Sequence, residues 1–150
     1  MPNKKRILVV DDEPGILNFV CTRLETAGYE VVAAVDGEEG LLEARTGHFD
    51  LILLDLFMVP TSGFVVLDQL RSFSNVPVII FSAHSYLIEK AFRLGANDFL
   101  AKPFDPDVLI AKINRLVSPK APRLAEKRPR DGRSFEGSTP SSLAGGSRQS

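Results

Sequence analysis

Four places in this sequence carry side chains suited to metal or phosphoryl chemistry, and each directly follows a short apolar run. The acidic pair Asp11 and Asp12 follows ILVV, Asp55 follows LILL, Ser82 follows VIIF and Lys102 follows DFLA. Carboxylates are ligands that Mg²⁺ prefers, while lysine and serine can hold phosphate oxygens by charge and hydrogen bonding. Together, these residue types indicate a metal-assisted reaction of a phosphoryl group.

The aspartates differ in the role that each could take. Clustered carboxylates repel one another, and a bound divalent cation removes that cost. Mg²⁺ keeps several waters and binds phosphate oxygens, so Asp11 and Asp12 would leave coordination sites open for a phosphoryl group. Asp55 ends a buried run and is the candidate nucleophile, because carboxylates can form aspartyl phosphate. Lys102 and Ser82 would then neutralise and hydrogen-bond the phosphoryl oxygens.

The elements that must position these residues are visible as alternating apolar runs and amphipathic stretches. Strands are predicted at Ile7 to Val10, Val31 to Val35, Leu51 to Leu54, Val76 to Phe81 and Asp98 to Ala101, each followed by a helical pattern. Near-continuous apolar strands need helices on both faces of a parallel sheet, which predicts a doubly wound α/β fold. Because the crevice of such folds lies beyond the carboxyl ends of the strands, the reactive residues should meet there.

Three glycines mark expected helix ends. Gly28, Gly47 and Gly95 each follow a helical pattern. Glycine at such a position predicts the left-handed backbone conformation that commonly ends a helix. These stops support five repeats of a strand followed by a helix.

Each reactive residue has an ordinary structural explanation when it is considered alone. Asp11 and Asp12 could cap and charge the start of the first helix. Asp55 could simply enter a loop, and Lys102 before Pro103 could be a solvated charge at a strand end. All of them fall at one edge of the predicted sheet, however, and this coincidence favours a shared site.

Charge divides the chain into two unlike parts. The 150 residues carry a net charge of −1. Residues 1–117 contain 11 basic and 16 acidic side chains, which gives a net charge of −5. Residues 118–150 contain 7 basic and 3 acidic side chains, which gives a net charge of +4. The second part is rich in Pro, Ser, Gly and Arg, which predicts a disordered tail or linker, or a basic segment that docks on an acidic partner. We therefore expect one domain at 1–117 and a tail at 118–150, without direct nucleic-acid binding.

Two features bear on location. The lone cysteine, Cys21, cannot form an internal disulfide and fits a reducing compartment. The apolar run before Asp11 is too short for a signal peptide or a membrane span. We expect a cytoplasmic protein that does not associate with membranes.

Four segments carry a family resemblance. ILVVDDEPG, LILLDLFMVPTSG, VPVIIFSAH and GANDFLAKPFDP resemble the receiver domains of response regulators, over about residues 5 to 117. The resemblance implies a flavodoxin-like (βα)5 fold with strand order 2-1-3-4-5, and Mg²⁺ as cofactor. It also implies that Asp55 is both the phosphoacceptor and a metal ligand. Asp12 would bind the metal directly, and Asp11 would bind it through water or assist in binding it. The main-chain carbonyl of Phe57 would be a further ligand.

The resemblance extends to switching residues and shows two departures. Ser82 and Lys102 correspond to the hydroxyl and the lysine that contact the phosphoryl group. Phe99 corresponds to the aromatic residue that changes rotamer with Ser82, and Pro103 corresponds to a proline after a cis peptide bond. Receivers often have proline four residues after the phosphoacceptor, where this chain has Val59 followed by Pro60. The positions of Phe57 and His84 tune phosphoryl loss in the family, and a bulky Phe57 predicts a comparatively long-lived phosphorylated state.

The function expected is that of a switch. A sensor histidine kinase or phosphotransfer protein would phosphorylate Asp55, and the face around Tyr86, Lys90, Arg93 and Phe99 would contact an unknown output protein or domain. We expect a monomer or a weak phosphorylation-dependent dimer, and no enzymatic activity beyond self-phosphorylation and autodephosphorylation. Nothing after Val117 resembles a helix-turn-helix or catalytic domain, so the sequence fits either a stand-alone receiver or the front of a longer regulator.

Two other functions on the same fold are less well supported. A nucleotide- or flavin-binding module would need a glycine- or hydroxyl-rich loop after the first strand, where this chain has Asp-Asp-Glu-Pro-Gly. A metal-dependent phosphatase would need a second aspartate two residues after Asp55 as general acid, where this chain has Phe57.

Overall fold

A central parallel sheet organises the chain in the computed structural model, which describes residues 4–118. The strands are β1 (Arg6–Val10), β2 (Glu30–Ala34), β3 (Leu51–Asp55), β4 (Val78–Ser82) and β5 (Asp98–Ala101), and they lie in the order β2-β1-β3-β4-β5. This order and the repeated βα arrangement confirm the predicted doubly wound, flavodoxin-like fold. The predicted tail, apart from Ser118, lies outside the described residues.

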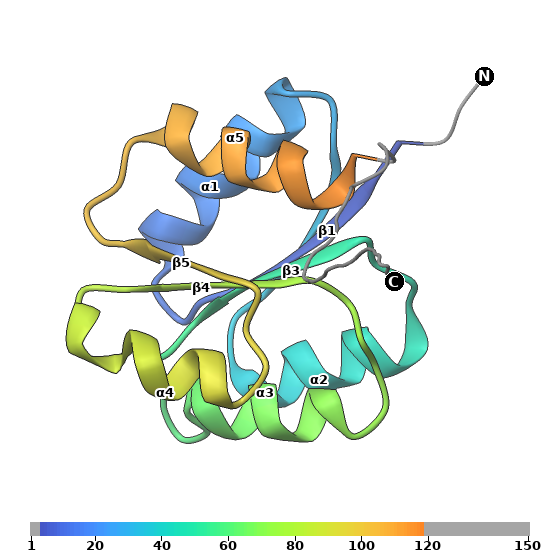
Figure 1. Cartoon of the computed structure of the whole chain (residues 1–150). Coiled ribbons are helices and arrows are strands. Elements are labelled where there is room, and N and C mark those ends of the chain that lie inside the picture. The colour runs from blue at the N-terminus through green and yellow to red at the C-terminus, as the bar shows by residue number, and fades with distance from the viewer. Residues whose placement is uncertain (1–3, 119–150) are drawn as a thin grey trace, which may run out of the picture. The chain divides into compact units, whose positions relative to one another are not determined.

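Helices cover both faces of the sheet. They are α1 (Pro14–Thr26), α2 (Gly37–Thr46), α3 (Gly63–Arg71), α4 (Ile88–Arg93) and α5 (Pro106–Val117), with a short 3₁₀ turn, η1 (Ser85–Leu87), before α4. Helices α1 and α5 lie on one face, and α2, α3 and α4 lie on the other (Figure 1). The strands are therefore covered on both sides, as their apolar runs require.

Alternate residues of each strand feed two separate hydrophobic cores. Leu8 and Val10 of β1 belong to the core under α2, α3 and α4, whereas Ile7 and Val9 belong to the core under α1 and α5. All residues of β3 and β4 are buried. This two-sided burial fixes the register of the central strands, because a slip of one residue would exchange the two faces.

The helix-end glycines do not all behave as predicted. Gly28 and Gly95 have φ angles of 101° and 108°, so the left-handed conformation is confirmed at both. The prediction for Gly47 is wrong: its φ is −109° and its backbone is extended. A Cβ atom there would lie 3.0 Å from the Phe49 ring and 3.1 Å from the Glu43 carbonyl oxygen. Glycine at this position therefore provides space for a neighbouring ring rather than a positive φ angle.

Gly63, the first residue of α3, packs against the backbone at the end of β3. A Cβ atom on Gly63 would lie 2.1 Å from the carbonyl oxygen of Asp55 and 2.8 Å from the Cα atom of Leu56. The amide of Gly63 also donates a hydrogen bond of 2.8 Å to the Leu56 carbonyl. The start of α3 and the end of β3 are thus in direct contact, with no room for a side chain.

We predict that Gly63→Ala lowers the free energy of unfolding by roughly 2–3 kcal/mol, because neither backbone segment can move away without disturbing the core. Urea denaturation measures this change. Gly15→Ala in α1 is the matched control: nothing lies within 4 Å of its Cβ position, so that variant should be as stable as the wild type or up to about 1 kcal/mol more stable. Equal stability of the two variants would contradict the prediction.

Candidate functional site

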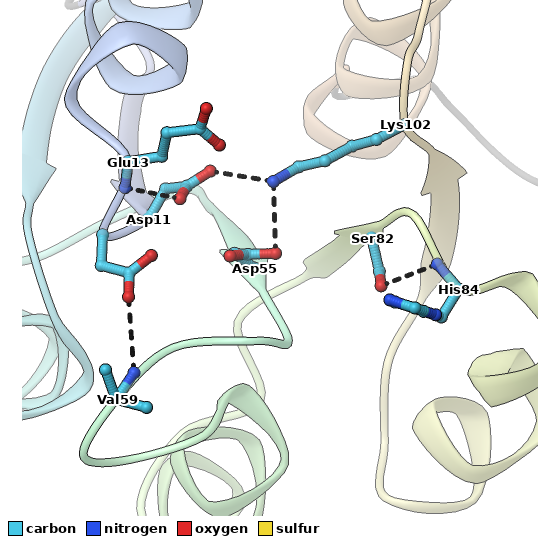
Figure 2. A network of polar contacts seen from close by, with 8 residues as sticks. Asp11, Glu13, Asp55, Val59, Ser82, His84 and Lys102 are labelled. Carbon is cyan, nitrogen blue, oxygen red and sulfur yellow. Dashed lines mark hydrogen bonds and ion pairs between the residues drawn. The ribbon is translucent and has the colours of Figure 1, made fainter.

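The parallel strands bring the predicted reactive residues to one edge of the sheet. Asp55 is the last residue of β3, Ser82 is the last residue of β4, and Lys102 directly follows β5. Asp11 and Asp12 follow β1 in the loop before α1. The sheet order sets β3 between β1 and β4, so Asp55 stands between the acidic pair and the serine (Figure 2).

Lys102 joins two buried carboxylates. Its Nζ atom lies 3.2 Å from Oδ2 of Asp11 and 3.4 Å from Oδ1 of Asp55 (Figure 2). Asp11 is fully buried and Asp55 is 4% exposed. The main-chain amide of Lys102 donates a 2.9 Å hydrogen bond to the carbonyl of Ser82, which extends the pairing of β5 with β4 beyond the strand ends.

The alternative in which Asp11 and Asp12 cap the first helix does not describe this geometry. The N-cap of α1 is Glu13, whose side chain accepts no capping hydrogen bond. Asp11 Oδ1 accepts a 3.0 Å hydrogen bond from the Glu13 amide, and Asp12 Oδ2 accepts one of 3.4 Å from the Val59 amide (Figure 2). Asp11 therefore holds its own loop in shape, and Asp12 reaches across to the loop after β3.

Three carboxylates at this edge could bind one metal ion. One oxygen atom from each of Asp11, Asp12 and Asp55 lies within 4.8 Å of the other two. Two of the three side chains are buried and the third is exposed, which leaves a side open to solvent. Carboxylate oxygens so arranged fit a hard divalent cation such as Mg²⁺, which retains waters in its remaining positions.

The electrostatics of the pocket leave its negative charge only partly balanced. The pKa of Asp55 rises from 3.8 to about 6, chiefly because burial disfavours the charged carboxylate and secondly because Asp11 is negative. Lys102 opposes this rise through its charge and hydrogen bond. An added cation would stabilise ionised Asp55, so the chemistry of the donor set and its charge both fit the predicted metal.

Sequence and structure comparisons decide the family. The model of the response regulator receiver domain matches residues 7–114. The chain belongs to the response regulator receiver domain family. The geometry described above thus occurs in a receiver of the kind used in two-component systems, and neither a nucleotide- or flavin-binding module nor a phosphatase is favoured.

Several relatives carry names of transcriptional regulators. The chain is 43% identical over 117 residues to the probable transcriptional regulator ycf27 of Cyanophora paradoxa, covering 77% of this chain and 49% of that protein. It is 39% identical to the DNA-binding dual master transcriptional regulator RpaA of Synechocystis sp., covering 75% of this chain and 48% of that protein. The chain therefore spans about half the length of these relatives.

Solved receiver structures have the same fold. The Francisella response regulator 1452 receiver domain is 35% identical with a TM-score of 0.73, covering 76% of this chain and 97% of that one. The response regulator TrrA of Thermotoga maritima, solved in complex with Mg²⁺-BeF, is 35% identical with a TM-score of 0.70, covering 75% and 98%. Within the described part of this receiver, no helix is long and apolar enough to cross a membrane.

The serine and the predicted switch aromatic of the receiver are both buried. Ser82 is 1% exposed, and its Oγ accepts a 3.1 Å hydrogen bond from the His84 amide (Figure 2). Phe99 is 9% exposed and belongs to the core that contains Ile80 and Ala91. Phe99 therefore does not lie on the predicted output surface, because β5 turns this side chain towards α4; Tyr86, in contrast, is 76% exposed.

The loop after β3 departs from the usual receiver pattern at its proline, as the sequence indicated. The Val59–Pro60 peptide bond is cis, and the predicted cis bond between Lys102 and Pro103 is confirmed. Phe57 in this loop has a half-exposed ring that packs edge-on against His84, with 4.5 Å between centroids. The metal contact predicted for the Phe57 carbonyl stays a prediction.

Two arrangements were not found from the sequence. The His84 ring also packs edge-on against Tyr86, with 5.6 Å between centroids, so Phe57, His84 and Tyr86 form an aromatic row beside the site. The ammonium of Lys102 lies 4.7 Å from the centroid of the Phe81 ring. Aromatic residues near the strand ends were a signal in both cases, but their spacing along the chain does not reveal which rings meet.

We predict that Asp55→Asn makes the metal-free receiver more stable at neutral pH. The folded-state pKa of Asp55, about 6, lies above its unfolded value, so the wild type loses stability as pH rises from about 4 to about 6. Asparagine removes this loss, and the gain should be about 1–3 kcal/mol at pH 7 and vanish near pH 4. Urea denaturation in EDTA across this pH range measures it.

Asp68→Asn is the control, because Asp68 is an exposed residue of α3. Its stability should follow that of the wild type at every pH. A gain for Asp55→Asn that does not change with pH, or no gain at pH 7, would show that the buried charge is not the cause.

Proposed function

We propose that this receiver takes a phosphoryl group onto Asp55 from the phosphohistidine of a sensor histidine kinase or phosphotransfer protein. The observation that carries the proposal is the placement of Lys102 between the buried carboxylates of Asp11 and Asp55, beside the exposed Asp12. Under this proposal the nucleophile, the metal-binding acid pair and the phosphoryl-binding cation are members of one cluster of side chains. The related TrrA was solved in complex with Mg²⁺-BeF, which supports Mg²⁺ and a phosphoryl group as ligands of the site proposed here.

The transfer follows from the positions of the side chains. A carboxylate oxygen of Asp55 attacks phosphorus in line with the leaving imidazole nitrogen; the O–P bond forms, and the P–N bond breaks with its electron pair going to the imidazole. Bound Mg²⁺ supplies positive charge for the phosphoryl oxygens. Lys102 exchanges a carboxylate contact for a phosphoryl oxygen. The metal would be held by Asp11, Asp12, Asp55 and the main-chain carbonyl of Phe57.

The switch acts through the residues next to the transferred group. Ser82 Oγ turns from the His84 amide towards a phosphoryl oxygen, and Phe99, in the core beside Ala91 of α4, changes rotamer as α4 shifts. Such a phosphoryl group biases an equilibrium between two pre-existing states. The exposed Tyr86, Lys90 and Arg93 form the surface that an output protein or domain contacts.

The receiver works as a cytoplasmic switch without turnover beyond self-phosphorylation and autodephosphorylation, as a monomer or a weak phosphorylation-dependent dimer. One relative is named as a DNA-binding regulator, so the output is control of transcription. The expectation of no direct nucleic-acid binding then applies only to residues 1–117, whose net charge is −5. Residues 118–150 would then link the receiver, as domain 1–117, to an output region.

The central prediction concerns the phosphorylated residue. Acetyl phosphate with Mg²⁺ should add one phosphoryl group to the wild type, none to Asp55→Asn and none after chelation with EDTA; intact mass measures the addition. Asp50→Asn is the control, because Asp50 lies at the opposite edge of the sheet, where it accepts a hydrogen bond from the Arg6 amide. Phosphorylation that persists in Asp55→Asn would defeat the proposal.

A second prediction concerns the lifetime of the phosphoryl group. The Phe57 ring packs against His84, and Phe57 lies two residues after Asp55 in the chain. We therefore expect the ring to hinder the approach of water to the phosphorus. Phe57→Ala should lose the phosphoryl group several-fold faster than the wild type, as followed by intact mass after removal of acetyl phosphate. Val59→Ala, in the same loop with a 78% exposed side chain, should match the wild type. An unchanged or slower loss in Phe57→Ala would rule out shielding.

A further inference from the structure

The Phe81 ring lies under the cation of the site. The Lys102 ammonium is 4.7 Å from the ring centroid, and Phe81 is fully buried in β4, directly before Ser82. The ring of Phe104 packs edge-on against the same ring, with centroids 6.1 Å apart and an interplanar angle of 83°. Phe81 therefore contacts both Lys102 and Phe104, which lie in the loop between β5 and α5.

Neighbouring residues of β4 thus hold both ends of Lys102. The Ser82 carbonyl accepts the hydrogen bond of its main-chain amide, and the Phe81 ring contacts its ammonium. In the strand register, Phe81 lies opposite Leu100 and Ser82 lies opposite Ala101. A lysine side chain is long and flexible, so a contact at its far end limits where the charge can lie.

An aromatic face is well suited to hold this cation during phosphoryl transfer. An ammonium group has three N–H donors, and Asp11 and Asp55 accept at 3.2 and 3.4 Å. The ring attracts the charge through its quadrupole and requires no directed N–H donor. A donor consequently remains for a phosphoryl oxygen, whereas a third carboxylate would compete for it and add negative charge.

We propose that Phe81 is a positioning residue for phosphoryl transfer, whose ring face holds the Lys102 ammonium between Asp11 and Asp55. The inference rests on the function proposed above and adds a residue to it. The simpler reading, that Phe81 only fills the core under α1 and α5, requires the volume of the ring but not its charge distribution. Fluorination separates the two, because it weakens the negative ring face and changes the size of the ring little.

The test replaces Phe81 in the full chain with phenylalanines carrying one, two or three ring fluorines. The rate of phosphorylation by acetyl phosphate at fixed Mg²⁺ should fall with each fluorine, by roughly three- to tenfold across the series. Phe49 is the matched control: the Arg6 guanidinium carbon lies 4.7 Å from its ring centroid, at the opposite edge of the sheet. Fluorination of Phe49 should leave the rate unchanged.

A flat rate across the Phe81 series, or an equal fall in the Phe49 series, would overturn the inference while leaving phosphorylation of Asp55 intact. A second measurement does not depend on phosphorylation. In the wild type the ring current of Phe81 should shift the Lys102 ε-methylene proton resonances upfield, and Phe81→Leu should return them to the position of free lysine. Wild-type resonances already at that position would also overturn it, whereas absence of phosphate on Asp55 in the wild type would contradict the proposed function instead.

Discussion

Burying Asp11 and Asp55 within reach of one ammonium places two negative charges and one positive charge where water screens them weakly. One lysine leaves the pair with a net negative charge, and burial together with the charge of Asp11 raises the pKa of Asp55 to about 6. The remaining negative charge favours binding of a divalent cation, which would also offset the negative charge of a phosphoryl group. The fold must therefore supply the free energy that keeps the two acids buried.

That free energy comes from strands that are covered on both faces. Because β3 and β4 are buried throughout, the two residues that end them, Asp55 and Ser82, are held by the register of the sheet and not by flexible loops. The contact of Gly63 with the Asp55 carbonyl adds the start of α3 to this frame. Precise placement of a nucleophile by rigid elements is what phosphoryl transfer requires, since catalysis there is largely positioning and charge.

Local patterns were enough to predict a doubly wound fold and the meeting of the reactive residues, because apolar runs define strands and parallel strands end at one edge. The strand order came from the family resemblance. What sequence could not supply was side-chain direction. Gly47 was expected to adopt a positive φ angle, but its lack of a side chain instead provides space for Phe49. A sequence does not distinguish these two reasons for a glycine. Phe99 faces the core instead of the surface, and the contact of Lys102 with Phe81 joins residues on adjacent strands. Such contacts depend on packing across the sheet, which periodicity does not encode.

The aromatic row of Phe57, His84 and Tyr86 connects the loop after β3 to the turn that begins α4. The two loops are therefore in contact through these rings, separately from the buried Ser82 and Phe99. A protein that docks on Tyr86 would affect the loop after β3 through His84 and Phe57. A phosphoryl group on Asp55 would in turn affect the position of Tyr86 through the same contacts. Coupling between binding equilibria is reciprocal, so an output partner that prefers the phosphorylated receiver must also stabilise the phosphoryl group against loss to its donor. The affinity of the partner and the equilibrium phosphorylation of the receiver would then depend on one coupling free energy.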